Sequence, residues 1–384
     1  MRLLIVFLLI IQPFILAAQN IRVSVFNSRE IQSFTVNIKQ GRYLLKKGNE
    51  VMGEYKKGST FSVILFGDII EVRDKRDFIG NFQTVEFEST DNEGIISVNP
   101  VKPAINARDF DDHLFVSIKD KKMLIVNRLD LEKYIAAVME AEGGNNAPSE
   151  YYKAQAVLIR TFTIKNLYKH AEEGFNLCDE VHCQAYRHRC SQHPAIIDAA
   201  LFTEGKVLTD KEQILIMSPF HSNCGGNTSA SGTVWQKDLP YLIPVIDPFC
   251  TASVHASWSY AITKDQWNRF LKSYMKSDID YKLYDFSFNL PRRARFIAIH
   301  GVDLNLRTVR EYFGLKSAYF SIVDTGDSLY FKGRGYGHGV GMCQEGAMEM
   351  ARVGYSWQDI VHFYFRDVEV TDYREMELQR YKPE

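Results

Sequence analysis

One carboxylic acid, Glu142, has the setting that acid–base chemistry needs. It ends an expected helix and precedes a flexible Gly143-Gly144 turn. A lone surface glutamate is most often only a solvated charge, so its neighbours matter. Lys153 and Arg160 lie seven residues apart, about two helical turns, so both project from one face. That basic face can hold an oxyanion or sugar hydroxyls.

Two further polar residues belong to this group. Gln155 offers a neutral hydrogen-bonding side chain on the helix that carries the basic residues. Glu140 is the competing carboxylate two residues before Glu142, and on a helix it points to a different side. The two acids are therefore not expected to serve one site.

Cysteine and histidine side chains gather between residues 178 and 190. The group comprises Cys178, His182, Cys183 and Cys190. Thiolate and imidazole ligands suit a tetrahedral structural zinc site, whereas export would favour disulfides; the six cysteines of the chain allow 15 pairings. Adjacent His182 and Cys183 reach one ion only if the chain turns there. His188 and His193 are expected at the surface.

The glycine-rich run from Gly333 to Gly341 is not a phosphate cradle. It lacks the Gly-Lys-Ser/Thr ending of a P-loop and the strand–turn–helix setting of a dinucleotide site. Its glycines are expected to let backbone approach closely and to present Tyr336 and His338 to a cleft. Tyr241 is expected in the core or a cleft wall, and Ser222 beside a tight Gly225-Gly226 turn that lines the groove.

Helices must position these residues. Asp130 is expected to cap a helix that runs through Val138 to the Gly143-Gly144 turn, and Pro148 suits the first turn of a second helix that stops before Gly174. Further helices are expected at 265–275, 304–313 and 345–352. Short alternating strands fill residues 21–110, followed by a hairpin around Asp120-Lys121.

The expected fold is therefore α+β, in four parts. Residues 1–18 form a secretory signal peptide, 19–110 a β-rich N-terminal region, 111–372 the catalytic domain and 373–384 a C-terminal tail. The net charge of −1 gives no basic field for nucleic acid, and no stretch after the signal is long and apolar enough for a membrane span. The protein is thus expected to be secreted, periplasmic or bound to the cell wall.

Five blocks of the sequence resemble one known family. In chain order they are Leu129–Glu142 with Lys153–Phe162, Cys178–Tyr186, Ser222–Thr228 with Trp235 and Pro240-Tyr241-Leu242, Leu304–Ser317, and Gly333–Ala347. Their order and content are similar to the stage II sporulation protein D (SpoIID/LytB) family, most strongly over residues 112–370. Two positions depart from its pattern: members often have Glu-Met-Pro where this chain has Glu142-Gly143-Gly144, and Ser is common at Cys343.

The resemblance implies a lytic transglycosylase of peptidoglycan. Glu142 takes the position of the catalytic acid, with Lys153 and Arg160 at the basic positions. The implied substrate-binding residues are Gln155, Gln184, Tyr186, Ser222, Tyr241, Tyr336, His338 and Gln344. No cofactor is implied for catalysis, although some relatives use Cys and His at the 178–190 cluster for a structural zinc.

Three functions remain open from the sequence. The first is cleavage between N-acetylmuramic acid and N-acetylglucosamine with formation of a 1,6-anhydro ring, on strands stripped of stem peptides. The second is a non-catalytic module that binds wall glycan and enhances an amidase partner. The third is a zinc-dependent hydrolase, which would need an open metal position and a nearby base.

Overall fold

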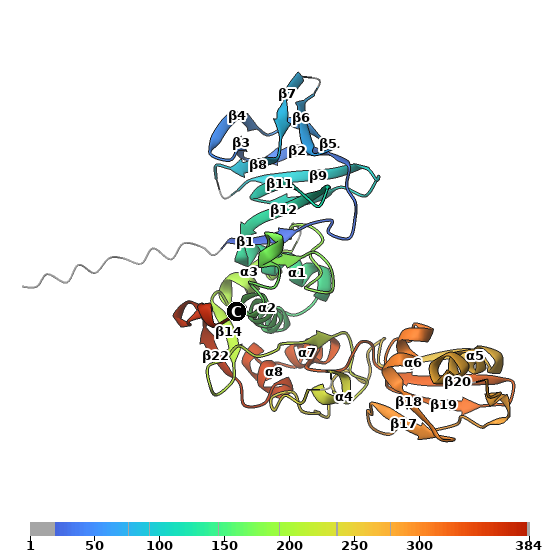
Figure 1. Ribbon diagram of the computed structural model, residues 1–384. Coiled ribbons are helices and arrows are strands. Elements are labelled where there is room, and N and C mark those ends of the chain that lie inside the picture. Colours follow the sequence, from blue (N-terminus) through green and yellow to red (C-terminus); the bar gives the residue numbers. More distant parts are fainter. Residues whose placement is uncertain are drawn as a thin grey trace, which may run out of the picture. The chain divides into compact units, whose positions relative to one another are not determined.

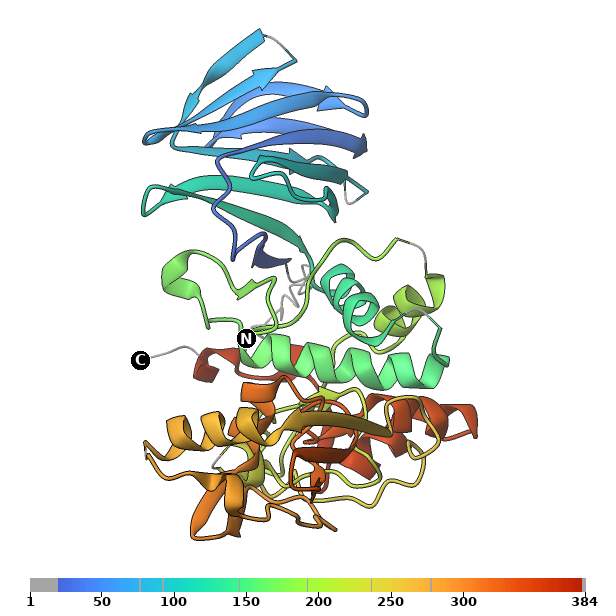
Figure 2. The same ribbon diagram turned by 90° about the vertical axis from the view of Figure 1, so that its right-hand side faces the viewer.

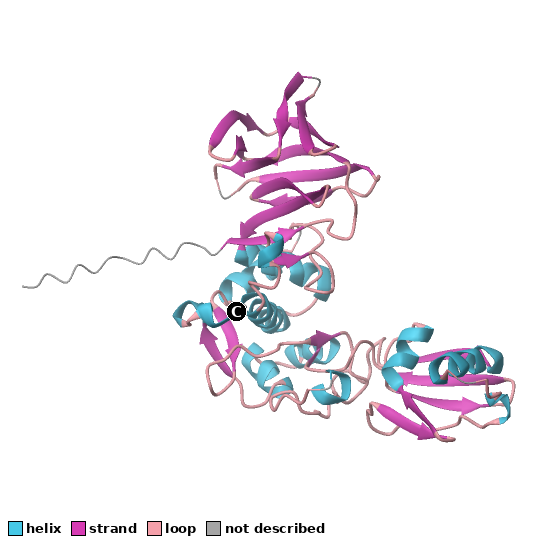
Figure 3. Cartoon of the chain, viewed as in Figure 1, coloured by secondary structure: helices cyan, strands magenta, loops and turns pink. Residues whose placement is uncertain are grey.

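The computed structural model describes residues 20–381 except residues 76, 92, 145, 192, 236 and 277. Helices and strands both contribute to the fold, which confirms the α+β expectation (Figures 1 and 3). The expected signal peptide, residues 1–18, lies outside the described residues. No helix in the described part of the chain is long and apolar enough to cross a membrane.

The chain divides into two compact units. The first comprises residues 20–23 and 30–134 of the described chain, and the second comprises residues 24–29 and everything from Ile135 onward. The division falls at Tyr134 and not near residue 110, because the strands at 113–119 and 122–130 pair with each other and extend the sheet that contains the strand at 84–89. The expected tail from Tyr373 also belongs to the second unit.

The first unit is built from antiparallel strands. They are β1 (Asn20–Ser24), β2 (Ser33–Gln40), β3 (Arg42–Lys47), β4 (Glu50–Lys56), β5 (Thr60–Phe66), β6 (Ile69–Asp74), β7 (Asp77–Phe82), β8 (Thr84–Ser89), β9 (Ile95–Lys102), β10 (Arg108–Asp111), β11 (His113–Lys119) and β12 (Lys122–Asp130). One sheet has the order β10-β9-β2-β5-β6-β7, and the other runs β1-β12-β11-β8-β3-β4 within this unit. The ring of Phe61 on β5 meets that of Phe87 on β8 at 5.1 Å and joins the two sheets.

Two local predictions in this unit are confirmed. The β11–β12 hairpin turns at Asp120 and Lys121, which both have positive φ, 50° and 63°. The Asp130 side chain caps the next helix by accepting bonds from the backbone N–H groups of Glu132, at 2.8 Å, and Lys133, at 3.3 Å. Asp130 therefore fixes where α1 (Leu131–Gly143) begins.

The second unit mixes helices and short strands. Its helices are α1 from Ile135 onward, α2 (Ser149–Lys165), α3 (Pro194–Phe202), α4 (Ser231–Trp235), α5 (Lys264–Met275), α6 (Leu306–Phe313), α7 (Gln344–Arg352) and α8 (Trp357–Tyr364). Its strands are β13 (Leu177–Cys178), β14 (Lys206–Thr209), β15 (Phe220–His221), β16 (Ser257–Thr263), β17 (Phe296–Ile299), β18 (Val302–Asn305), β19 (Phe320–Asp324), β20 (Ser328–Arg334), β21 (Met342–Cys343) and β22 (Glu369–Asp372).

Helix α2 is the central element of this unit. Most of its residues are buried, and it packs against α3, α7, α8 and β14 (Figure 2). Pro148 is its N-cap and not its first-turn residue, and the helix ends at Lys165, before Gly174 as expected. The helices expected at 265–275, 304–313 and 345–352 correspond to α5, α6 and α7. Helices α3, α4 and α8 were not predicted from the sequence.

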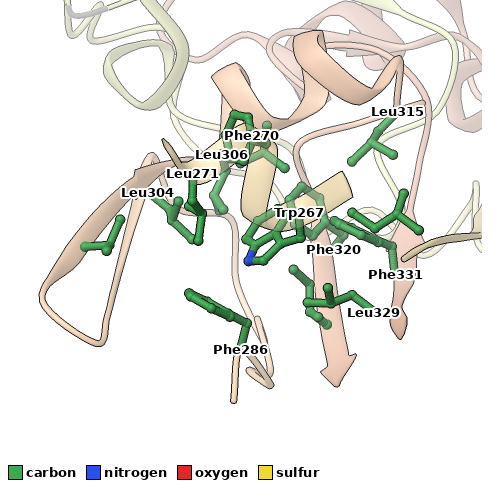
Figure 4. Packing of buried hydrophobic residues seen from close by; sticks show 14 of the residues in the cluster. Trp267, Phe270, Leu271, Phe286, Leu304, Leu306, Leu315, Phe320, Leu329 and Phe331 are labelled. Atoms are coloured by element: carbon green, nitrogen blue, oxygen red, sulfur yellow. The ribbon is translucent and has the colours of Figure 1, made fainter. Parts of the chain in front are cut away.

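A separate apolar cluster lies under α5 and α6. Trp267 stands at its centre, with its ring 5.2 Å from Phe270 and 5.6 Å from Phe286 (Figure 4). The strands β16, β20 and β19 form the sheet on which these rings pack. This cluster accounts for many of the aromatic residues of the sequence by core packing alone.

Candidate functional site

The Glu142 carboxylate lies at the end of α1 with one oxygen fixed. Its Oε1 accepts a hydrogen bond from the backbone N–H of Ala185 at 3.0 Å. Its Oε2 has no hydrogen-bond partner, and the side chain forms no ion pair, within the part of the chain that the structure describes. The group is half-buried, so one oxygen is oriented while the other is open to exchange a proton.

Gln344 holds the backbone of Glu142 in place. Its Nε2 donates to the Glu142 carbonyl at 3.1 Å and to the Tyr151 hydroxyl at 3.2 Å. Tyr151 is fully buried on α2. Burial raises the pKa of Tyr151 above its usual range, with a smaller contribution in the same direction from the charge of Glu142. Tyr151 therefore stays protonated and neutral beside the acid.

The Gly143-Gly144 turn has a steric reason. A Cβ at Gly143 would lie 2.3 Å from Gln155 Oε1 and 2.8 Å from the Tyr151 hydroxyl. Gly144 has φ +68°, a conformation that glycine adopts without strain. The Tyr152 hydroxyl completes the turn, since it donates to the Gly144 carbonyl at 3.1 Å. The departure from the family's Glu-Met-Pro thus makes room for side chains of α2.

Gln155 lies beside the acid with its amide unpaired. It is fully buried, and neither its Nε2 nor its Oε1 has a hydrogen-bond partner in the described chain. Tyr151 and Gln155 are four residues apart on α2, so both face Gly143. An unpaired buried amide costs about 1–3 kcal/mol, which a polar partner at this position would recover.

The predicted basic face exists but lies against α3. Arg160 is fully buried, and its guanidinium donates to the carbonyls of Ala200 and Lys206, both at 3.0 Å. Lys153 pairs with Glu150 at 2.5 Å and lies 4.2 Å from the centre of the Phe202 ring. The expectation that these two cations face the acid is corrected, because these partners lie in α2 itself, in α3 and in the chain that follows α3.

Glu140 has its own surroundings, as expected. Its carboxylate lies 3.5 Å from His188 Nδ1 and 3.8 Å from His193 Nε2. Cys190 donates its thiol to Glu140 at 3.8 Å. The two acids of α1 therefore have different partners.

Three of the expected substrate-binding residues are structural. Tyr186 is fully buried, and the Tyr241 hydroxyl accepts from the Met217 backbone N–H at 3.0 Å. The Gln184 side chain accepts from the Thr163 hydroxyl at 3.0 Å. These side chains fix loops to α2 and the core, and the backbone of Ala185, between Gln184 and Tyr186, carries the contact to Glu142.

Two further candidates for substrate binding, Tyr336 and Ser222, contact residues other than Glu142. Tyr336 is exposed, with its ring 5.4 Å from that of His255. Ser222 is half-buried, and its carbonyl accepts from the Glu345 N–H at 3.0 Å. Among the predicted binding residues, Gln344 bonds to the Glu142 carbonyl and Gln155 packs against the adjacent Gly143.

Both ring nitrogens of His338 form hydrogen bonds with backbone groups. Its Nδ1 accepts from the Val340 N–H at 3.1 Å, so its Nε2 carries the proton and donates to the Phe220 carbonyl at 3.0 Å. Burial lowers the pKa of His338 to about 4. A neutral imidazole with both nitrogens engaged is not a second acid or base.

This histidine predicts a pH dependence of stability. Its folded pKa is depressed, so between about pH 6.5 and about pH 4 the unfolded chain binds a proton that the folded chain does not. The free energy of unfolding should therefore fall as pH falls through that window. Urea unfolding of His338→Gln should show a shallower dependence, whereas His362→Gln, at an exposed position, should match the parent. Equal slopes for His338→Gln and the parent would contradict this account.

The structure brings together four potential metal-binding side chains, and one of them differs from the group expected from the sequence. The ligand atoms of His170, Cys178, His182 and Cys183 lie within 4.8 Å of one another. Residues 181–183 form a turn, which brings the adjacent His182 and Cys183 to one side. His170 takes the place expected for Cys190, because Cys190 lies beside Glu140. All six cysteines are free thiols.

Sequence reasoning missed several residues of this region. Tyr151, the Ala185 N–H and His170 were not singled out. The spacing of His170, eight residues before Cys178, is a signal that could have added it to the cluster. No sequence signal marks a backbone N–H donor.

Comparison with known proteins gives a consistent result. Residues 119–209 match the family described as Stage II sporulation protein. The chain is 29% identical over 263 residues to Stage II sporulation protein D of Bacillus subtilis, covering 64% of this chain and 76% of that protein. It is 28% identical over 287 residues to an uncharacterized protein of Brachyspira hyodysenteriae, covering 73% and 77%. Amidase enhancer of Bacillus subtilis matches at 26% over 280 residues, but the match spans only 38% of that protein.

Proposed function

Because this chain belongs to the SpoIID/LytB family, we propose that it is a lytic transglycosylase that cleaves peptidoglycan glycan with Glu142 as its single acid–base residue. The observation that carries the proposal is the setting of Glu142. One carboxylate oxygen is anchored by the Ala185 N–H, and the other has no partner in the described chain. No cation pairs with the group there.

The proposed reaction needs only this one carboxyl group. Protonated Glu142 donates through Oε2 to the glycosidic oxygen between N-acetylmuramic acid and N-acetylglucosamine, and the bond to the muramyl C1 breaks. The resulting carboxylate takes the proton of the muramyl C6 hydroxyl, whose oxygen bonds to C1. The proton lost in the first step is regained in the second, and no water is consumed. Ordinary glycoside hydrolysis uses two carboxylates instead.

Neighbouring residues have positioning roles in this proposal. Gln344 and Tyr151 fix the backbone of Glu142, and the buried Gln155 packs against Gly143 beside it. Lys153 and Arg160 act at a distance, by holding α2 against α3. The protein would work at the cell wall or in the periplasm, on glycan strands.

The Cys/His cluster fits a structural zinc. Two thiols and two imidazoles form the donor set that tetrahedral zinc prefers. His170, Cys178, His182 and Cys183 would hold the ion, which would stabilise the turn two residues before Ala185. Four side chains complete a tetrahedron and leave no position for a substrate, so a zinc-dependent hydrolase is the weakest of the three functions.

A binding module that enhances an amidase is the second candidate. It is favoured by the likeness to Amidase enhancer and by the engagement of Lys153 and Arg160 elsewhere, which leaves no described cation at Glu142. In that case the protein would bind glycan without cleaving it, and an amidase would be the partner.

Incubation of the protein with intact and with peptide-free glycan strands tests the proposal. Products that end in 1,6-anhydro sugar, identified by mass, support the lytic transglycosylase. Unchanged strands that still bind the protein would favour the enhancer. Cleavage abolished by a chelator, with products that carry a reducing end, would favour the zinc hydrolase.

Gln344→Ala tests the positioning role. The change removes both the bond to the Glu142 carbonyl and the bond to Tyr151. Loss of alignment should lower kcat about 10- to 100-fold with KM little changed. Gln358→Ala, at an exposed position on α8, is the matched control and should retain full activity. An unchanged kcat for Gln344→Ala would argue against this role.

A further inference from the structure

A second cluster of metal-binding side chains lies in the interior of the second unit. Cys224, Asp247, Cys250 and Cys343 are each fully buried, and their ligand atoms lie within 4.8 Å of one another. They come from three chain segments: the turn after β15, the loop at 247–250, and β21. The parallel pairing of β21 with β15 brings Cys343 beside Cys224.

The buried carboxylate of Asp247 has no cationic partner. It accepts from the Tyr364 hydroxyl at 2.9 Å, from the Phe249 N–H at 2.9 Å and from the Cys224 thiol at 3.2 Å. No ion pair with it occurs among the described residues. Buried charges are normally paired or bind metals, so this carboxylate is suited to bind a cation together with the three thiols.

The separations suit a tetrahedral ion better than a disulfide. Ligands bound to zinc at about 2.3 Å for sulfur and about 2.0 Å for oxygen lie about 3.5–3.8 Å apart. The Cys224 and Cys250 sulfurs are 3.4 Å apart, close to that value and far from the S–S bond of about 2.05 Å. A disulfide would also leave the third thiol buried and unused, whereas an ion uses all three.

We propose that Cys224, Cys250, Cys343 and Asp247 bind a structural zinc ion, in addition to the His170 cluster. The ion replaces the three thiol protons, which pass to solvent, and no oxidation state changes. The resulting site has three thiolates and one carboxylate around a divalent cation, and a net charge of −2.

Neighbouring groups are arranged to support that negative charge. The Cys343 sulfur accepts from the backbone N–H groups of Cys224, at 3.2 Å, and Gly346, at 3.4 Å. The half-buried Arg293 donates from its guanidinium to the Cys224 carbonyl at 2.7 Å. Gly346 is required here, since a Cβ would lie 2.4 Å from Asp247 Oδ2.

The ion would connect distant segments next to the candidate active site. Cys343 immediately precedes Gln344, whose side chain holds the backbone of Glu142. A zinc ion at Cys343 would therefore fix the start of α7, and with it the donor that positions the acid. This role is structural and does not depend on the proposed glycan chemistry.

Metal analysis of the purified full-length protein tests the proposal. Wild type should contain two zinc ions per chain, and Cys183→Ser, which disrupts the His170 cluster, should keep one. X-ray absorption of the zinc in Cys183→Ser should show three sulfur ligands at about 2.3 Å. Cys250→Ser should lose the ion of the second cluster while the His170 cluster keeps its own.

Two results would overturn this inference. In the first, Cys183→Ser holds no zinc. In the second, mass analysis of the unreduced, denatured protein shows a disulfide among Cys224, Cys250 and Cys343. Both measurements use wild type or Cys183→Ser, so they stay informative if Cys250→Ser does not fold. A wild type with a single zinc that survives in Cys183→Ser would support this site and count against the His170 one.

Discussion

Glu142→Gln is expected to lower the rate of glycan cleavage by at least about 10³-fold, because one residue supplies both the acid and the base. The amide cannot donate an acidic proton to the glycosidic oxygen, nor accept one from the C6 hydroxyl. Its carbonyl oxygen can still accept from the Ala185 N–H, so the turn should keep its structure. The measurement is the initial rate of release of 1,6-anhydro products from peptide-free strands.

Glu140→Gln is the matched control for this variant. It makes the same change on the same helix, but at a carboxylate that faces His188, His193 and Cys190. Cleavage by Glu140→Gln should stay within a few-fold of wild type, and both variants should melt near the wild-type temperature. A Glu142→Gln protein that is folded and active would refute the assignment of the acid.

Arg160→Met is expected to lower the free energy of unfolding by about 3–5 kcal/mol, although the residue was first identified as part of the catalytic group. The change removes two charge-assisted hydrogen bonds, to the carbonyls of Ala200 and Lys206, each worth about 1.5–3 kcal/mol. Urea unfolding followed by circular dichroism measures the loss. The rate of cleavage per folded molecule should change little.

Lys153→Met provides the comparison. Lys153 forms an ion pair with Glu150 at a partly exposed position, and pairs of this kind are worth about 0–1 kcal/mol. Its effect on stability should therefore be small. An Arg160→Met protein with wild-type stability but no cleavage would return Arg160 to a direct role in catalysis.

Local features of the fold were predictable because they depend on neighbouring residues. The hairpin at Asp120-Lys121 and the cap at Asp130 follow from side chains that act within a few positions of themselves. The second unit was less predictable. Helices α3 and α8 are short, and their place against α2 depends on distant segments.

The candidate site shows the same division between local and distant contacts. The seven-residue spacing did place Lys153 and Arg160 on one face of a helix, but it could not tell which neighbour that face meets. Glu142 is oriented by Ala185 and Gln344, 43 and 202 residues away. Contacts of that separation are set by tertiary packing, and one of them is a backbone N–H that every residue type offers.

The cysteines illustrate the limit most clearly. Three were grouped by their closeness in sequence, yet Cys190 lies with Glu140 and His170 takes its place. Cys224, Cys250 and Cys343 span more than a hundred residues. The pairing of β15 with β21 brings Cys343 near Cys224, and Cys250 reaches them from the loop at 247–250. Spacing predicts a metal site when the ligands lie on one loop, and fails when the fold assembles them.

The central claim is that Glu142 closes a ring within the sugar and does not activate water. Cleavage of peptide-free strands in water enriched in heavy oxygen distinguishes these two outcomes directly. The account predicts product ends that are 1,6-anhydro sugars and carry no heavy oxygen, because the C6 hydroxyl of the muramyl residue supplies the new bond. Reducing ends that carry one heavy oxygen atom would contradict it and identify the protein as a hydrolase.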